Sequence, residues 1–442
     1  MPLVEILSFS CADPVPPALT GFSIETPKAG HTSDNYVFEV QGWVVSNGSP
    51  ATAIEVWYRD RSIRRVPLNV PRPDVAEYYQ TKLPNPNCGF WCMIGTIGFP
   101  LVFDLILRVV FGEETETVPV ATIRVRRGSL ASAFWPKLHP LLITSLGRTG
   151  TTWLMKLLAA APGVVTYNAY PYEMMPSKYW MHLLKVASEP ANHLESAHWG
   201  NFSHSLNWIG QNPYFAAPLT DHAPLLAWFG KTYMENLAEF CQQSIQSFYQ
   251  TLAATQGVQS PRYFAEKSYP DHVPWLLWDL YPKAREVILV RDFRDMVASI
   301  YATNAKRGTQ DFGRGEASED QDYIKMLATH AQHLCDSWKM RSSRAHLVRY
   351  EDLILKPHAT LQRLLDYLGL DSTSSAIEFI LHEAKKDTPE LREHRTASSP
   401  EASVGRWQTD LSPALQDQCN NAFGVVLEEF GYAGKGQENA GH

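Results

Sequence analysis

A turn with two glycines, one arginine and three threonines is the part of this chain best suited to chemistry. It lies between a short apolar segment that begins at Leu141 and a helical pattern that runs to Leu158, and it reads Gly147, Arg148, Thr149, Gly150, Thr151 and Thr152. A helix start offers unpaired N–H groups and a positive dipole end, so a strand–turn–helix of this kind can hold phosphate. Glycine allows close backbone approach, threonine adds hydroxyl donors, and Arg148 adds a charged fork.

The turn differs from the nucleotide-kinase loop G-x-x-x-x-G-K-[ST] at two positions. When the two are aligned on Gly150, Thr151 stands at the lysine position and Ser145 at the first glycine position. A nucleotide triphosphatase without that lysine loses its contact to the β- and γ-phosphates. The turn is therefore predicted to bind phosphate but not ATP–Mg²⁺. An ordinary crossover turn with two incidental glycines is the alternative that this segment alone leaves open.

A second segment offers another group suited to an anion. Residues Glu286–Val290 are predicted to form a strand, Arg291 follows it directly, and Ser299 lies eight residues further on in the next predicted helix. Arg291 thus falls at the carboxyl end of a strand, where open α/β sheets bind their ligands. An arginine and a serine at this spacing can hold a second phosphate group.

Together the two segments resemble the sulfotransferases that use 3′-phosphoadenosine 5′-phosphosulfate (PAPS). The family's 5′-phosphosulfate loop, P-[KR]-S-G-T-T-W, is matched by Gly147-Arg-Thr-Gly-Thr-Thr-Trp153, and its 3′-phosphate motif is matched by Arg291 with Ser299. Two further matches follow in the family's order: Tyr350-Glu-Asp-Leu353, and Val404-Gly-Arg-Trp407 preceded by His394-Arg-Thr396. The resemblance covers about the last two thirds of the chain. It is closer to the carbohydrate-type and bacterial-type members than to the drug-metabolising ones.

The resemblance implies a set of contacts to the nucleotide. Arg148 stands where the family has Lys or Arg at the 5′-phosphosulfate, and Trp153 matches the family's Trp that packs on adenine. The other cofactor-binding residues that it implies are Gly147, Thr149, Gly150, Thr151 and Thr152 at the phosphosulfate, and Arg291, Ser299, Arg395 and Arg406 at the 3′-phosphate. PAPS would be the donor and 3′-phosphoadenosine 5′-phosphate (PAP) the product, with no metal.

Three residues are implied in catalysis: Arg148, Lys267 and Glu173. Lys267 ends the predicted strand that begins at Tyr263, and it resembles the family's second lysine near the transferred sulfuryl group. Protein cations can stabilise the charge that builds on the leaving oxygen, and a base must take the proton of a hydroxyl acceptor. Glu173 in Tyr170-Pro-Tyr-Glu173 is the preferred base and His272 is the competing one. The family's K-T-H sequence is replaced by Lys267-Ser-Tyr269, so its histidine is absent there.

The chain is predicted to hold two domains and a tail. Residues 137–432 should form an α/β domain with a central parallel sheet, flanking helices and the phosphate-binding turn. Residues 1–130 alternate like strands, show no helical period and are predicted to form an all-β sandwich. Its clearest strands are Asn35–Val45, Ala53–Tyr58, Ser62–Val70, Phe103–Phe111 and Val118–Val125, and its tryptophans Trp43, Trp57 and Trp91 are predicted to be core. Residues 433–442 should be disordered, and 302–323 could form a mobile lid.

Composition narrows the class further. The 442 residues carry a net charge of −7, which argues against nucleic acid as a general partner. Six scattered cysteines, with only Cys88 and Cys92 close together, do not have zinc-ligand spacing. The N-terminus lacks the basic region of a signal peptide, and no apolar stretch is long enough to span a bilayer. We therefore expect a cytoplasmic protein without a membrane span; its oligomeric state is left open.

The expected activity is PAPS-dependent transfer of a sulfuryl group to an acceptor hydroxyl. A carbohydrate or glycolipid acceptor is preferred, because a helical insertion rich in Trp and His, residues 176–255, follows the first strand–helix unit and could form the wall of an acceptor pocket. A small phenol or alcohol is the second candidate. The alternatives are a module that binds PAP or PAPS without catalysis and a nucleotide kinase, against which the missing loop lysine argues.

Overall fold

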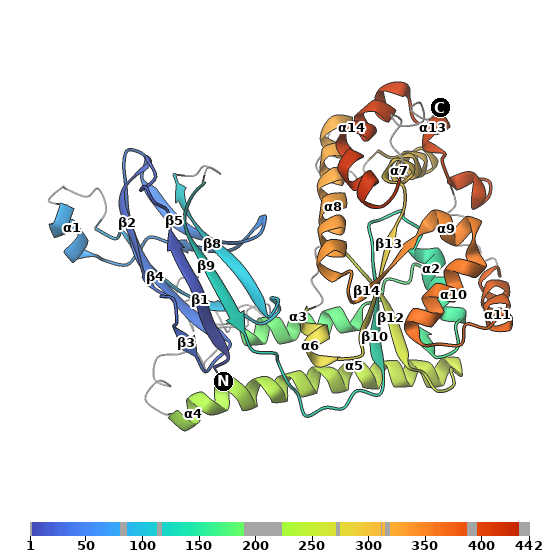
Figure 1. The fold of residues 1–442 in the computed structure, drawn as a ribbon, viewed down its shortest axis with the longest axis horizontal. Coiled ribbons are helices and arrows are strands. Elements are labelled where there is room, and N and C mark those ends of the chain that lie inside the picture. The colour runs from blue at the N-terminus through green and yellow to red at the C-terminus, as the bar shows by residue number, and fades with distance from the viewer. Residues whose placement is uncertain are drawn as a thin grey trace, which may run out of the picture. The chain divides into compact units, whose positions relative to one another are not determined.

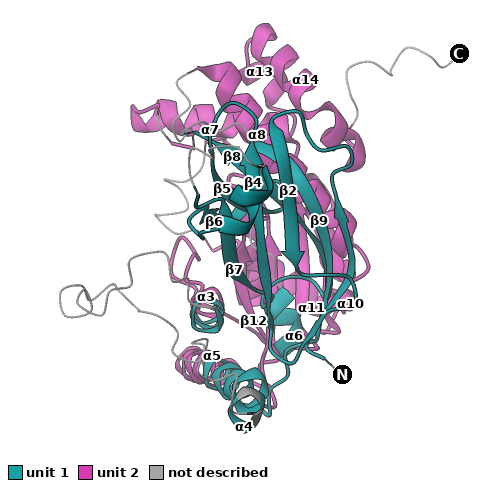
Figure 2. Cartoon of the chain, turned by 90° about the vertical axis from the view of Figure 1, so that its left-hand side faces the viewer, with its two compact units in different colours: residues 1–134, 180–242, 274–280 teal, residues 135–179, 243–273, 281–442 magenta. Residues whose placement is uncertain are grey.

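A computed structural model describes residues 2–79, 86–112, 117–189, 223–270, 275–310, 312–313, 319–386 and 396–432. The chain divides into two compact units, shown in different colours in Figure 2. The first unit comprises residues 1–134, 180–242 and 274–280, and the second comprises residues 135–179, 243–273 and 281–442. The predicted tail, His272 and Arg395 lie outside the described residues. Within the described part, no helix combines the length and apolar character needed to cross a membrane.

The first unit contains two antiparallel sheets (Figure 1). In sheet order, the larger one consists of β3 (Thr32–Ser33), β1 (Val4–Cys11), β9 (Thr117–Arg127), β8 (Val102–Phe111), β5 (Ala51–Tyr58) and β6 (Arg61–Pro67). The smaller one consists of β2 (Leu19–Thr26), β4 (Val37–Ser46) and β7 (Gly89–Gly95). The antiparallel N-terminal region that the sequence predicts is therefore confirmed.

Alternation of side chains explains the core of the first unit. In β8, Leu105, Leu107 and Val109 are fully buried, while the residues between them are more exposed. They form one apolar core with residues of the smaller sheet such as Val40 and Phe90. Strands bury every second residue in this way when one face of each sheet packs on a core.

Two expectations for the first unit were wrong. The helix α1 (Pro73–Tyr79) forms within a region predicted to lack helices. Pro73 favours a helix start, but α1 has seven residues and buries only Val75, so it leaves no periodic signal in the sequence. The tryptophans predicted to be core are only partly buried and lie outside the shared core: Trp43, Trp57 and Trp91. Their strand positions face away from it.

The second unit is built on a parallel five-stranded sheet, as predicted. In sheet order its strands are β11 (Val164–Thr166), β12 (Tyr263–Ser268), β10 (His139–Thr144), β13 (Arg285–Val290) and β14 (Ala345–Arg349). All four neighbouring pairs are parallel, so the carboxyl ends of the strands lie along one edge. That edge carries the residues which follow β10, β12 and β13 in the chain.

Helices cover both faces of this sheet (Figure 1). In β13, Val287 and Leu289 pack in one core with α2 (Thr151–Ala160), α10 (Pro357–Leu368) and α11 (Ser374–Ala384). The alternate residues Ile288 and Val290 pack in a second core with α7 (Phe293–Arg307), α8 (Asp320–Arg341) and α14 (Pro413–Glu429). A strand buried on both faces must be apolar at nearly every position, which is why the β13 segment is so apolar.

The remaining helices are short or belong to the insertion. They are α3 (Pro176–Ser188), α4 (Ala223–Ala227), the π-helix η4 (Trp228–Tyr233), α5 (Met234–Gln256), α6 (Trp275–Leu280), α9 (Tyr350–Leu355), the 3₁₀ helix η5 (Glu401–Ser403) and α13 (Trp407–Asp410). Residues 190–222, which hold much of the Trp- and His-rich sequence, lie outside the described part. The stretch predicted as a lid is partly regular, because α7 runs to Arg307 and α8 begins at Asp320.

Candidate active site

The turn between β10 and α2 is shaped by two residues with left-handed backbone. Arg148 has a φ of 62° and Gly150 has a φ of 92°. A side chain on Gly150 would also overlap the ring of Tyr350, which packs against the turn. Glycine is thus required at position 150 for two reasons, its backbone conformation and the close approach of Tyr350.

The threonines of the turn have different surroundings. The buried hydroxyl of Thr149 lies 2.7 Å from the carbonyl oxygen of Leu146 and contacts the hydroxyl of Ser145, so it holds the turn together. Thr151 and Thr152 lie in the first turn of α2, partly exposed. Trp153 follows them, packs on the core beneath and has a buried indole N–H without a hydrogen-bond partner among the described residues.

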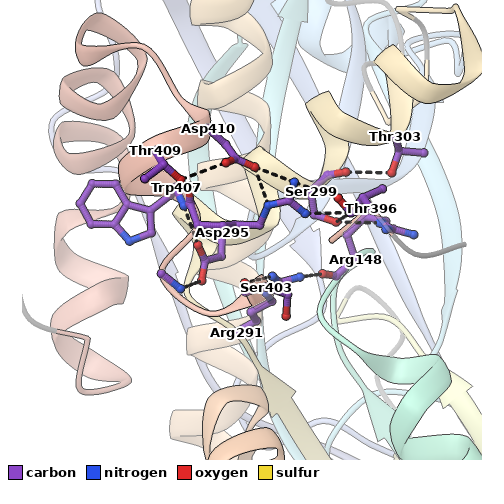
Figure 3. Close-up of polar contacts among 12 residues, drawn as sticks. Arg148, Arg291, Asp295, Ser299, Thr303, Thr396, Ser403, Trp407, Thr409 and Asp410 are labelled. Carbon is purple, nitrogen blue, oxygen red and sulfur yellow. Dashed lines mark hydrogen bonds and ion pairs between the residues drawn. The ribbon is translucent and has the colours of Figure 1, made fainter. Parts of the chain in front are cut away.

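Arg291, at the end of β13, is a cation enclosed by the protein. Its side chain donates hydrogen bonds to the carbonyl oxygens of Arg148, at 3.1 Å, and Ser403, at 2.5 Å (Figure 3). The guanidinium carbon lies 4.7 Å from the centre of the Tyr350 ring, and the residue is 4% exposed. Among the described residues, its buried Nε has no hydrogen-bond partner. A buried cation with these neighbours is well suited to receive an anion.

The predicted binding residues from three parts of the chain meet at this point. Nε of Arg148 donates a 3.1 Å hydrogen bond to Oγ of Ser299, which also lies 3.5 Å from Oγ1 of Thr396 (Figure 3). Arg406 donates to the same Thr396 oxygen at 2.8 Å and forms an ion pair with Asp410. Burial, assisted by the nearby charge of Arg291, lowers the pKa of Arg148 to about 10. The structure therefore concentrates positive charge where a polyanion could bind.

Asp295 is a residue of this site that the sequence did not identify as functional. Its carboxylate accepts hydrogen bonds from the main-chain N–H groups of Gly405, at 2.7 Å, and Trp407, at 2.9 Å (Figure 3). It thereby fastens the loop that carries Arg406 to the first turn of α7. Burial is the main reason why the pKa of Asp295 is raised to about 6. The only signal in the sequence was an acid four residues after Arg291.

Lys267 and Glu173 are brought together at the end of β12. The Lys267 ammonium donates to the carbonyl oxygen of Pro171, at 2.6 Å, and to a Glu173 carboxylate oxygen, at 3.3 Å. Lys267 is 8% exposed and Glu173 is 50% exposed. Burial lowers the pKa of Lys267, against the opposing effect of the Glu173 charge. Lys267 pairs with Ile143, near the end of β10. Lys267 therefore lies at the sheet edge that carries the turn at Gly147–Gly150.

Glu266 is a second residue that the sequence did not single out. It is 1% exposed and accepts hydrogen bonds from the main chain and hydroxyl of Ser177, at 2.9 and 2.6 Å, and from the Tyr249 hydroxyl, at 2.6 Å. Its carboxylate therefore holds the start of α3, three residues after Glu173, against β12. Burial raises the pKa of Glu266. Glu266 precedes Lys267 directly in β12.

A cavity of about 280 Å³ lies beside the turn in the second unit. Gly147 and Arg148 form part of its wall, and Tyr269 and His330 contribute side chains with polar groups. The apolar lining comes from Leu146, Pro270, Met296, Ile300, Phe312 and Leu327. Burial, and to a smaller extent the carboxylate of Glu173, raises the pKa of Tyr269. No trio of His, Cys, Asp or Glu among the described residues is arranged to hold a metal ion.

The fold and the site define an α/β protein with a buried cationic site at the carboxyl ends of parallel strands. The model of the sulfotransferase family matches residues 140–374, more than half of the chain. The chain belongs to the sulfotransferase family.

The similarity to individual proteins is lower than the match to the family model. No curated protein sequence matches the chain. Among solved structures, the mouse sulfotransferase SULT7A1 complexed with PAP is 11% identical, with a TM-score of 0.35 over 70% of this chain and 87% of that one. Sulfotransferase STF9 from Mycobacterium avium is 17% identical, with a TM-score of 0.33 over 69% of this chain and 79% of that one.

Proposed function

We propose that this protein transfers a sulfuryl group from PAPS to a hydroxyl group of an acceptor. The observation that carries the proposal is the enclosed Arg291, which lies against the main chain of Arg148 and whose Nε has no hydrogen-bond partner in the described part of the chain. Residues from two strand ends thus form one site for an anionic ligand. PAPS bears a phosphate at its 3′ position and a phosphosulfate at its 5′ position, which suits two groups of donors lying side by side.

We assign the 3′-phosphate to Arg291, Ser299 and Arg406, with Arg395 as a further candidate from the sequence. Ser299 is 2% exposed, and its hydroxyl is already within hydrogen-bond distance of Arg148. The 5′-phosphosulfate falls to Gly147, Arg148, Thr149, Gly150, Thr151 and Thr152, where main-chain N–H groups at the start of α2 and the Arg148 guanidinium are the donors. Thr149 acts there through its main chain, since its hydroxyl is used within the turn. Trp153 is proposed to contact the adenine.

The reacting groups are proposed to meet between Arg148, Lys267 and Glu173. When PAPS is bound, it supplies a sulfuryl group attached to a phosphate leaving group. The acceptor oxygen forms a new bond to sulfur, the bond from sulfur to the phosphate oxygen breaks, and its electron pair stays on that oxygen. Arg148 and Lys267 stabilise the negative charge that develops there. The proton of the acceptor hydroxyl passes to the Glu173 carboxylate, whose half-exposed position leaves it accessible.

The acceptor has two candidates. A carbohydrate or glycolipid hydroxyl is the one that the sequence favours, and we propose residues 1–130 as an accessory domain of sandwich type whose role would be to serve such an acceptor. A small phenol or alcohol is the second. The cavity beside Arg148 favours this second candidate, because most of its lining is apolar.

Calorimetric titration with PAP, run beside ATP–Mg²⁺, tests the donor site. We expect PAP to bind and ATP–Mg²⁺ not to bind. Arg291→Ala should weaken PAP binding by roughly 100-fold or more, because it removes a charged hydrogen-bond donor from an enclosed site. Arg291→Lys keeps the charge without the planar fork, so its affinity for PAP should lie between those of the wild type and Arg291→Ala. Arg363→Ala, a change of one exposed arginine on α10, is the matched control and should bind like the wild type.

Binding of PAP that is indifferent to Arg291 would contradict the proposed site. Binding of ATP–Mg²⁺ with hydrolysis would instead support a nucleotide kinase. Melting curves of each variant separate a lost contact from a lost fold, since Arg291 is buried.

A further inference from the structure

The amino-terminal edge of the parallel sheet, opposite the candidate active site, carries a row of cations. Four neighbouring strands, β12, β10, β13 and β14, each begin beside at least one of them. In sheet order the cations are Arg262, Lys137, Lys283, Arg285 and Arg344. Because parallel strands begin at one edge and lie about 4.8 Å apart, these residues share one end of the second unit.

The strand register brings the row to nearly one level. His139 of β10 pairs with Tyr263, the residue after Arg262, and Leu141 of β10 pairs with Arg285. The segments that lead into the strands therefore emerge at similar heights, and a flat partner can touch several of them at once. The fully exposed cations of the row are Arg262, Lys137, Lys283 and Arg344.

Acidic residues do not offset this charge in the segments that lead into the strands. These segments are residues 128–138, 257–262, 281–284 and 342–344, and none of them contains Asp or Glu. The acids within the four strands, Glu266 and Glu286, are buried. The edge is thus locally positive, although the whole chain carries a net charge of −7.

The neighbouring helix α5 adds no carboxylate in this unit. It runs past the edge (Figure 1), and the side chain of Gln246 accepts a 2.6 Å hydrogen bond from the main-chain N–H of Lys137. Residues 243–256, the part of α5 that belongs to the second unit, include no charged residue. The cations before β10 therefore border an uncharged helix.

Two arginines of the row also have contacts within the protein. Arg262 donates a hydrogen bond to the carbonyl oxygen of Gly369, at the end of α10. The guanidinium carbon of Arg285 lies 5.3 Å from the centre of the Tyr367 ring. A guanidinium has five N–H donors, so these contacts hold the side chains in place and leave donors for a partner.

An exposed indole accompanies the row. Trp135 stands two residues before Lys137 and is 86% exposed, the highest value for a large apolar side chain in the described part of the chain. Tryptophan favours the boundary between water and lipid, where its ring has apolar surroundings and its N–H remains hydrated. Lysine and arginine near the same boundary are attracted to anionic headgroups.

We propose that this edge binds the surface of a bilayer that contains anionic phospholipids. Lys137, Lys283 and Arg344 contact the headgroups, and the ring of Trp135 lies at the boundary with the acyl chains. The active site is at the other end of the strands, six residues or about 20 Å away along β12, and stays open to ligands from solution. The proposal does not depend on the proposed sulfuryl transfer.

Co-sedimentation of the full chain with vesicles tests the proposal. One kind of vesicle is phosphatidylcholine alone, and the other contains about 30% phosphatidylserine, both in about 0.1 M salt. We expect roughly tenfold or tighter binding to the mixed vesicles. That preference should disappear in about 0.5 M salt, because screening weakens attraction between surface charges. Equal binding to the two kinds of vesicle would overturn the proposal.

Paired variants locate the surface. Lys137→Gln combined with Lys283→Gln removes two exposed cations, each worth about fivefold in affinity for an anionic surface, so binding to mixed vesicles should weaken by roughly 30-fold. Lys325→Gln combined with Lys356→Gln is the matched control. Both are exposed lysines near the starts of α8 and α10, whose other ends lie at the row. Equal losses in the two double variants would remove this edge as the binding surface.

The indole has a test of its own. Lipids with brominated acyl chains should quench tryptophan fluorescence when the wild type binds, and Trp135→Ser should remove most of that quenching although 12 of the 13 tryptophans remain. Its affinity for mixed vesicles should fall roughly fivefold or more. Tyr78→Ser removes an aromatic ring that is 78% exposed in the first unit and should leave the affinity unchanged. Quenching that persists in Trp135→Ser would contradict the assigned orientation.

Soluble polyanions are the competing partners. Heparin and single-stranded RNA are titrated into the wild type under the same conditions. Tight binding of either, without binding to the mixed vesicles, would identify a surface for a soluble polymer and overturn the membrane proposal. Melting curves and the Kd for PAP should match the wild type in every variant, because none of the changed residues belongs to the core or to the proposed active site.

Discussion

Nε of Arg148 and Oγ of Ser299 are joined by a 3.1 Å hydrogen bond, although 151 residues separate them in the chain. Arg148 belongs to the turn after β10, and Ser299 lies two turns into α7. This contact connects the two motifs that the sequence singled out as phosphate-binding. It orients the guanidinium before any ligand arrives, which reduces the entropy that binding must overcome.

The first prediction follows from this contact. Ser299→Ala removes the hydrogen-bond acceptor of Arg148 and one hydroxyl from the proposed 3′-phosphate site. We expect PAP to bind roughly 10-fold more weakly, the effect of one lost hydrogen bond to a charged group. Calorimetry measures the change. Ser337→Ala, a buried serine of α8 whose hydroxyl lies 3.4 Å from the Pro270 carbonyl oxygen, serves as the control, and its affinity should match the wild type.

The second prediction concerns Gly150. Gly150→Ala forces a side chain into left-handed backbone and against the Tyr350 ring, so the free energy of unfolding should fall by about 2–4 kcal/mol. Gly147→Ala is the matched control, because a Cβ there meets no atom within 4 Å. Gly147→Ala should lower the free energy of unfolding by less than about 1 kcal/mol. Thermal and denaturant unfolding measure both, and equal losses in the two variants would contradict the role assigned to Tyr350.

The third prediction is a pH dependence at Asp295. Its pKa is raised from 3.8 to about 6, so the folded state binds a proton more readily than the unfolded state does. The stability that this proton confers is complete below about pH 4 and is lost as the pH rises through about 6. Relative to Asp295→Asn, the wild type should lose on the order of 2–3 kcal/mol of unfolding free energy between pH 4 and pH 7.

Urea unfolding of both proteins across that range measures the difference. The free energies of unfolding of the two proteins also differ by an amount that does not depend on pH, because asparagine cannot accept both main-chain hydrogen bonds. The change of this difference with pH is therefore diagnostic, and its absolute size is not. Asp417→Asn, at an exposed position of α14, reports the effect of removing one acidic charge. A difference that stays flat from pH 4 to pH 7 would rule out Asp295 as the titrating group.

The fourth prediction separates catalysis from nucleotide binding. Glu173→Gln keeps the shape of the side chain but removes the proposed base, so kcat should fall by roughly 100-fold or more while the Kd for PAP changes little. Lys267→Ala should likewise lower the transfer rate far more than PAP affinity. Rapid-quench measurement of a single turnover gives the rate of transfer. A wild type that binds PAP but transfers nothing to any acceptor would identify a binding module instead of an enzyme.

Much of the second unit follows from local patterns. The β13 segment predicts a strand buried on two faces, and Arg291 after it predicts a ligand contact at the sheet edge; the structure has both the strand and the enclosed arginine. Such predictions succeed because a few adjacent residues determine the backbone of a strand end or a turn. Helix α1 was missed for the opposite reason, since seven residues with one buried side chain carry no period.

The site is less predictable than the elements that carry it. Asp295 shows in the sequence as an ordinary acid in the first turn of a helix. Its bonds to Gly405 and Trp407 span more than 100 residues and depend on how the C-terminal loop packs on α7. The same holds for Glu266, whose partners Ser177 and Tyr249 come from two different helices.

The sequence alone determined the family, the parallel sheet and the residues at its strand ends, because those features are written in short runs whose local geometry depends on neighbours in the chain. The tertiary structure decided which of these residues meet. It joined Arg148 to Ser299, enclosed Arg291 beneath Ser403, and set His330 of α8 and Tyr269 around one cavity. Contacts between distant residues depend on the packing of whole helices against the sheet, and no local pattern encodes that packing.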